Sequence, residues 1–173
     1  FADETRNRVI ELAKRDNLVF DQVIYSLASP VRTDPKTGIM YRSAIKPIGK
    51  PFIGKTIDLV TYEFHELTVQ PATTEEIEAT VKVMGGEDWE LWIRALGEAG
   101  VLAPDCITLA YSYIGPEHSW PIYRDGTIGR AKTHLEETAH RIDESLRTSG
   151  GHAYVSINKA LVTRSSAVIP VIP

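Results

Sequence analysis

Three short apolar runs, separated by stretches with helical periodicity, constrain the fold of this chain most. The runs are VIYSLA (residues 23–28), CITLAYS (106–112) and AYVSIN (153–158). The first is short and almost wholly apolar, as is typical of a strand that is covered on both faces of a parallel sheet. Strands that alternate with helices indicate a parallel sheet flanked by helices. We therefore expect an α/β fold.

The helices expected between these runs have their own start and stop signals. Residues 4–15 form an amphipathic pattern, and Thr73 and Glu76 form a capping box before a helix that ends at Gly85 and Gly86. A further helix is expected over 87–99, with Trp89 and Trp92 in the core, and a long one over 127–147. Turn signals and alternating polarity over residues 31–70 predict one or two β-hairpins inserted in a single domain that spans residues 1–173.

Composition limits the class of protein. The chain has 173 residues, of which 43% are hydrophobic, which is enough for one domain with a core. A net charge of −4 argues against nucleic-acid or anionic-membrane partners, because either would need a basic face. Cys106 is the only cysteine, so no disulfide framework exists, and we expect it in the core. No apolar run is long enough to span a membrane, and we expect a soluble, cytoplasmic protein.

The ends of the sequence are unusual. The chain has no initiator methionine, begins almost directly in a predicted helix, and stops within the apolar segment SSAVIPVIP. We therefore expect this sequence to be an internal piece of a longer protein, so that parts of any functional site lie outside it.

Ligands of such sheets bind at the carboxyl ends of the strands. The three segments expected there are residues 27–30 (LASP), 112–118 (SYIGPEH) and 158–166 (NKALVTRSS). The stretch YRDGTIGRAK (123–132) follows the second of them. These segments are therefore expected to converge on one edge of the sheet.

Helical periodicity places Lys132 on an inward face. Apolar residues recur at steps of three and four along the long helix, and Lys132 falls within their stripe, whereas Arg130 falls on the far side. Nine residues of unbroken helix would turn by about 900° and separate Tyr123 from Lys132. Cooperation therefore requires a break, for which Gly126 supplies conformational freedom and Asp125 or Thr127 a cap. On these ten residues alone, a tyrosine packed at a turn remains the simpler interpretation.

Longer strings carry a specific resemblance. They are YSLASPVRTDPKTG (25–38), KPIGKPFIGKT (46–56), VMGGEDWELWI (83–93), YSYIGPEHSWPIYRDGTIGRAK (111–132) and VSINKALVTRSSAVIPVIP (155–173). Together they resemble the NADH-dependent trans-2-enoyl-CoA and enoyl-acyl-carrier-protein reductases, an enlarged branch of the short-chain dehydrogenase/reductases with a Tyr-x8-Lys pair. The resemblance covers nearly the whole chain.

The resemblance implies a Rossmann-like fold and the last step of the fatty acid elongation cycle, reduction of an enoyl thioester by NADH. It implies that Tyr123 is the catalytic acid and that Lys132 binds the NADH ribose and biases the phenol toward its phenolate. It implies that Tyr113 contacts substrate and that the NADH site is lined by Leu27, Ala28, Leu161, Val162 and Thr163. It also implies an enoyl-CoA or enoyl-acyl-carrier-protein partner and a monomeric full-length enzyme.

The chain departs from the family pattern in two places. Arg130 replaces the lysine that usually stands two residues before the catalytic lysine, which keeps the charge on the outer face. The glycine-rich turn that seats the pyrophosphate is absent from this sequence, so only half of the cofactor site is expected here.

Two other functions remain open at this point. One is a carbonyl reductase of the same superfamily, although its usual Tyr-x3-Lys pair is absent at Tyr111, Tyr113 and Tyr123. The other is a catalytically silent nucleotide-binding domain, against which the presence of both Tyr123 and Lys132 argues. The histidines have no metal-ligand spacing, and we expect no metal.

Overall fold

A three-stranded parallel sheet forms the centre of the protein. The computed structural model describes residues 1–58 and 61–161, and its sheet has the order β1 (Phe20–Tyr25), β6 (Leu102–Ile114) and β7 (His152–Lys159). All three strands run parallel, so their carboxyl ends lie at one edge. The predicted α/β architecture is confirmed, with β6 longer than the apolar run that signalled it.

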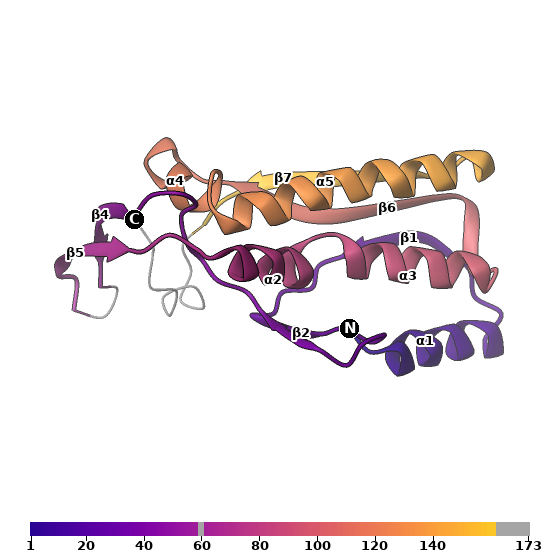
Figure 1. Cartoon of the computed structure of the whole chain (residues 1–173). Helices are drawn as coiled ribbons and strands as arrows, with labels where there is room; N and C mark the ends of the chain where they lie inside the picture. Colours follow the sequence, from indigo (N-terminus) through magenta and orange to yellow (C-terminus); the bar gives the residue numbers. More distant parts are fainter. Residues whose placement is uncertain (59–60, 162–173) are drawn as a thin grey trace.

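Two long helices, α3 (Glu87–Glu98) and α5 (Thr127–Leu146), pack on one face of this sheet. Helix α1 (Asp3–Arg15) packs against α3, and α2 (Thr74–Met84) precedes α3 (Figure 1). Trp89 and Ile93 of α3 pack with Ala110 of β6 and with the apolar stripe of α5. A second cluster joins Ala13 of α1 to Leu96 and Val101. The predicted capping box at Thr73 and Glu76 is present.

The opposite face of the sheet is largely uncovered among the described residues. Ile24, Leu109 and Tyr154 lie side by side in register on this face, and Ile24 and Tyr154 are 47% and 52% exposed. The prediction of a first strand covered on both faces is therefore wrong for this chain, because its described helices all pack on the other face.

Two β-hairpins separate β1 from α2, as the turn signals predicted. The first pairs β2 (Val31–Thr33) with β3 (Met40–Arg42), and the second pairs β4 (Phe52–Ile57) with β5 (Phe64–Val69). The second hairpin lies at the end of the molecule where the short helix α4 (Trp120–Tyr123) is found (Figure 1). In the part of the chain that the structure describes, no helix has the length and hydropathy needed to cross a membrane.

Candidate active site

The segments expected at the carboxyl edge of the sheet do follow the ends of the three strands. Leu27 and Ala28 come just after β1 and are exposed, and Leu161 comes two residues after β7 and is also exposed. Tyr113 is the penultimate residue of β6. Val162 and Thr163, which the resemblance placed in the cofactor site, lie outside the described residues.

The predicted helix break between Tyr123 and Lys132 is present. Tyr123 is the last residue of α4, and α5 begins at Thr127. The predicted cap is wrong, because Gly126 is the N-cap residue and no side chain caps the helix. The Thr127 hydroxyl instead donates a hydrogen bond to the Ala44 carbonyl.

Gly126 is required for space rather than for an unusual backbone conformation. Its φ of −90° is accessible to any residue. A Cβ at this position, however, would lie 2.4 Å from the Ile122 carbonyl oxygen and 2.5 Å from that of Lys46. The break therefore depends on a close approach of three backbone segments.

The face of α5 follows the predicted periodicity. The buried apolar positions are Ile128, Ala131, Leu135, Ala139, Ile142 and Leu146. Arg130 is exposed, and Lys132 is partly buried. Lys132 is therefore placed beside the sheet near its carboxyl edge.

Tyr113, Tyr123 and Lys132 meet at that edge. The Nζ atom of Lys132 donates to the Tyr113 carbonyl oxygen at 2.5 Å and to the Tyr123 carbonyl oxygen at 3.5 Å. It also lies 3.8 Å from the centre of the Tyr113 ring, a cation–π distance. The two tyrosine rings are 6.3 Å apart with an angle of 56° between their planes. The structure thus brings together the three residues singled out in the sequence.

The phenol of Tyr123 is held in its protonated form. Burial, with a smaller contribution from Tyr113, raises the pKa of Tyr123 to about 12. The expectation that Lys132 biases this phenol toward its phenolate stays a prediction. The ammonium group contacts the main-chain oxygen of Tyr123, and the burial of the phenol dominates its pKa.

The pKa of Lys132 is also shifted by its surroundings. Burial lowers the pKa of its ammonium group to about 8, and Glu136 partly opposes this change. The two carbonyl oxygens and the Tyr113 ring offer dipoles and π electrons rather than a full negative charge. The pKa of this amine therefore lies well below the usual range for lysine, and the ammonium form still predominates at pH 7.

A buried polar network lies beneath the carboxyl edge of the sheet and was not predicted from the sequence. Asp88 of α3 accepts hydrogen bonds from Arg6 at 3.0 Å and from the hydroxyl of Tyr25 at 3.2 Å. Arg6 and Asp88 are both almost fully buried. The network ties α1 and α3 to the last residue of β1, just before Leu27. Residues 82 positions apart leave no local pattern that would reveal such a pair.

Trp89 and Cys106 belong to the core. Trp89 is fully buried and donates from its indole nitrogen to the Thr108 hydroxyl at 2.9 Å, and Cys106 is buried in the core as predicted. No group of three or more potential metal ligands is found among residues 1–58 and 61–161.

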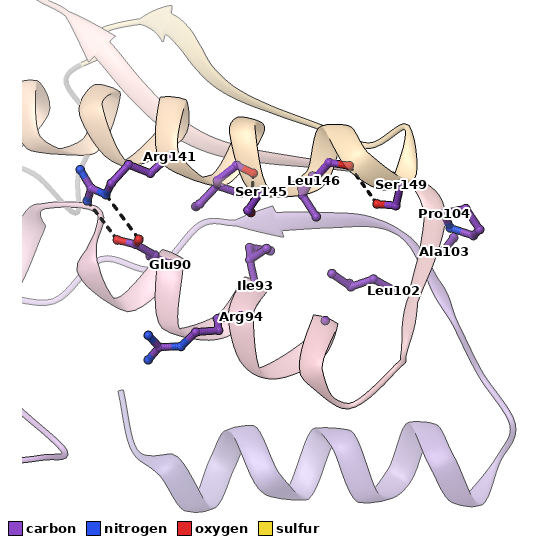
Figure 2. Close-up of a pocket in the computed structure, with 12 residues that line it drawn as sticks. Glu90, Ile93, Arg94, Leu102, Ala103, Pro104, Arg141, Ser145, Leu146 and Ser149 are labelled. Atoms are coloured by element: carbon purple, nitrogen blue, oxygen red, sulfur yellow. Dashed lines mark hydrogen bonds and ion pairs between the residues drawn. The ribbon is translucent and has the colours of Figure 1, made fainter.

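A cavity of about 530 Å³ lies between α3 and α5, away from the tyrosines (Figure 2). Its lining includes Ile93, Ile142 and Leu102, and the Glu90–Arg141 ion pair lies at its rim. Leu102 begins β6 and Ser149 follows the end of α5, so the cavity lies toward the amino ends of the strands. Ligands of parallel sheets bind at the opposite edge, and we assign this cavity no part in catalysis.

Comparison with known proteins decides the family. Residues 1–173 match the family model described as the trans-2-enoyl-CoA reductase catalytic region. The chain belongs to this family. The predicted resemblance is thereby confirmed. The matched residues include Tyr113, Tyr123 and Lys132.

Individual proteins similar to this chain support the family assignment. The chain is 60% identical over 173 residues to the trans-2-enoyl-CoA reductase (NADH) of Treponema denticola, and 51% identical to an enoyl-acyl-carrier-protein reductase (NADH) of Opitutus terrae. The crystal structure of the Treponema denticola enzyme in complex with NAD superimposes with a TM-score of 0.93 over 100% of this chain. The chain spans 43% of that protein and 44% of the Opitutus terrae one, less than half of each.

Proposed function

We propose that the full-length protein containing this chain reduces the trans-2 double bond of an enoyl thioester with NADH. The observation that supports this most strongly is the convergence of Tyr113, Tyr123 and Lys132 at the carboxyl edge of the sheet, in a member of this family. The substrate is an enoyl-CoA or an enoyl-acyl-carrier-protein, and the reaction completes a cycle of fatty acid elongation.

Tyr123 has the properties of the acid that this reaction needs. NADH supplies a hydride, which adds to the β-carbon of the conjugated thioester. The electron pair of the double bond then moves toward the thioester oxygen, where a negative charge develops. A neutral phenol can donate a hydrogen bond or its proton to that oxygen, and a proton taken up from solvent at the α-carbon then gives the saturated thioester. The pKa of Tyr123, raised to about 12, keeps the phenol protonated at neutral pH. A single such donor contributes about 3 to 4 kcal/mol to stabilising the transition state.

The ammonium group of Lys132 is suited to bind NADH. Its ammonium group has three N–H donors, and the described contacts to the Tyr113 and Tyr123 carbonyls use two of them. The third is available for an acceptor such as a ribose hydroxyl of NADH. The lysine would therefore join the cofactor to the backbone of both tyrosines.

The remaining site residues fit a surface against which cofactor and substrate pack. Leu27, Ala28 and Leu161 present exposed side chains after the carboxyl ends of β1 and β7, and we propose that they line the NADH site together with Val162 and Thr163. Tyr113, whose ring faces that of Tyr123, would contact the substrate. The pyrophosphate end of the cofactor requires residues that this chain does not contain.

The experiment that tests this function is NADH oxidation by the purified full-length protein. Absorbance of NADH would be followed with crotonyl-CoA, with crotonyl-acyl-carrier-protein and with acetoacetyl-CoA. Rapid oxidation with either crotonyl thioester and almost none with acetoacetyl-CoA is expected. Oxidation with acetoacetyl-CoA alone would identify a carbonyl reductase, and NADH binding without turnover would identify a silent nucleotide-binding protein. We further propose that the enzyme acts in the cytoplasm as a monomer.

A further inference from the structure

A short connecting segment runs between α2 and the start of α5. This segment, residues 43–47, is called the strap here, and it leads from β3 to β4 without regular secondary structure. Backbone amides in such a segment must find partners other than a helix or a sheet. In the strap, two buried threonines supply several of those partners.

Thr127, the first residue of α5, holds the strap from one side. Its side chain is fully buried, and its hydroxyl donates to the Ala44 carbonyl and accepts the Lys46 N–H at 3.2 Å. Its own N–H donates to the Lys46 carbonyl at 3.0 Å. This N–H is one of the four that a helix leaves unpaired at its start. The strap thus takes the place of a conventional N-terminal cap.

Thr80 of α2 holds the strap from the other side. It is also fully buried, and its hydroxyl accepts the Ala44 N–H at 2.9 Å and donates to the Glu76 carbonyl at 2.7 Å. The ammonium group of Lys46 pairs with the Glu76 carboxylate at 2.5 Å. The strap is therefore fixed to two helices at once.

The surrounding backbone leaves little room for adjustment. The Lys46 carbonyl oxygen that binds Thr127 would lie only 2.5 Å from a Cβ of Gly126, and a Cβ of Gly129 would lie 1.6 Å from the Arg124 carbonyl oxygen. Arg124 directly follows Tyr123. Thr127 lies four residues after Tyr123 and five before Lys132. A shift at the start of α5 would therefore change the position of the Lys132 side chain relative to that of Tyr123.

We infer that Thr127 and Thr80 are positioning residues, which hold the break between α4 and α5 through the strap and thereby set Tyr123 against Lys132. The inference rests on the proposed function for its catalytic consequence, but not for its structural one. Misplacement of reacting groups by about 1 Å can lower turnover by about a hundredfold. Both threonines would act through the strap rather than by touching the substrate.

The test compares three variants of the full-length enzyme. Thr127→Val removes the hydroxyl and keeps the shape, Thr127→Ser restores the hydroxyl, and Thr80→Val releases the strap from α2. Thr138→Val is the matched control, because Thr138 is also fully buried on α5 but its hydroxyl donates to the His134 carbonyl within the same helix. All four would be measured for kcat, for the pH dependence of kcat, for Tm and for hydrogen exchange.

Hydrogen exchange measures how firmly the backbone around the break between α4 and α5 is held, and it does not require an active enzyme. We expect amides of residues 124–132 to exchange about tenfold faster in Thr127→Val and Thr80→Val, with no such change in Thr138→Val. We expect kcat to fall by about tenfold to a hundredfold in the two strap variants, with a displaced pH profile, and to recover to within about threefold in Thr127→Ser.

The inference is overturned if Thr127→Val and Thr138→Val lose similar Tm while exchange over residues 124–132, kcat and the pH profile of Thr127→Val match those of the control. If Thr127→Val does not fold, Thr80→Val decides by the same criteria. Failure of the proposed function has a different signature, because the wild-type enzyme would then not reduce crotonyl thioesters while the exchange comparison would still hold.

Discussion

The Nζ atom of Lys132 lies over the ring of Tyr113, 3.8 Å from its centre, and 2.5 Å from the carbonyl oxygen of the same residue. One residue at the end of β6 therefore holds the lysine through both its side chain and its backbone. Because no full negative charge is among these partners, the lysine stays sensitive to its surroundings.

Removal of the Tyr113 ring is expected to lower the pKa of Lys132 below about 8. A cation–π contact contributes about 0.5 to 2 kcal/mol, which corresponds to about 0.4 to 1.5 units of pKa. Tyr113→Leu should therefore move the alkaline decline of NADH affinity to lower pH. Tyr113→Phe keeps the ring and should leave that decline in place. Equal declines in Tyr113→Leu and the wild type would show that the ring does not hold the ammonium group.

The affinity for NADH should fall as the pH rises through about 8, where Lys132 loses its proton. Below this pH the ammonium group is charged and can bind the cofactor, and above it the neutral amine binds less well. Lys132→Arg removes this titration, because a guanidinium stays charged throughout the range. Calorimetric titration of NADH between about pH 6 and pH 10 would measure both curves. A decline near pH 8 that persists in Lys132→Arg would assign the titration to another group.

Gly129→Ala should destabilise the full-length enzyme by about 1 to 3 kcal/mol, because its Cβ would lie 1.6 Å from the Arg124 carbonyl oxygen and the backbone must shift. The same substitution at Gly97, inside α3, meets only Leu102 Cδ1 at 3.8 Å. Gly97→Ala should therefore stabilise the protein by up to about 1 kcal/mol, as alanine does in helices. Urea denaturation of both variants measures the contrast, and a stabilising Gly129→Ala would refute the close approach.

Asp88→Asn should destabilise the full-length enzyme by about 3 kcal/mol or more, because it leaves the buried guanidinium of Arg6 without its buried partner. The exposed Arg94–Glu98 pair, 4.0 Å apart, provides the control. Glu98→Gln should change the free energy of unfolding by less than about 1 kcal/mol. Both free energies of unfolding would be measured by denaturant unfolding. A similar decrease in both variants would mean that the buried Arg6–Asp88 pair stabilises the protein no more than the exposed pair does.

Periodicity in the sequence was sufficient to predict the main helices and strands and to place Lys132 on the inward face of its helix. The apolar stripe of α5 defines an inward face whatever the helix packs against, so the position of Lys132 within it could be counted. The parallel sheet followed in the same way from the alternation of strands and helices. These features leave a local signal in the sequence, although the strand pairs themselves join residues far apart, and they were confirmed.

Side-chain contacts between distant residues leave no local pattern and could not be predicted. The Thr127 hydroxyl binds a strap more than 80 residues away rather than capping its own helix, and Asp88 pairs with Arg6 across 82 positions. The exposure of Ile24 and Tyr154 on one face of the sheet also has no signal in the apolar runs that predicted their strands. The raised pKa of Tyr123 depends on burial, which motif spacing does not encode.

The most direct test of the account is Tyr123→Phe in the full-length enzyme, measured by single-turnover NADH oxidation with crotonyl-CoA and by calorimetric NADH binding. Loss of one donor to the developing oxyanion should slow the chemical step by about a hundredfold or more. The NADH affinity should stay within about threefold of wild type, because the hydrogen bond from Lys132 goes to the main-chain oxygen of Tyr123, which the substitution keeps. A near-normal single-turnover rate in Tyr123→Phe would contradict the assignment of Tyr123 as the catalytic acid.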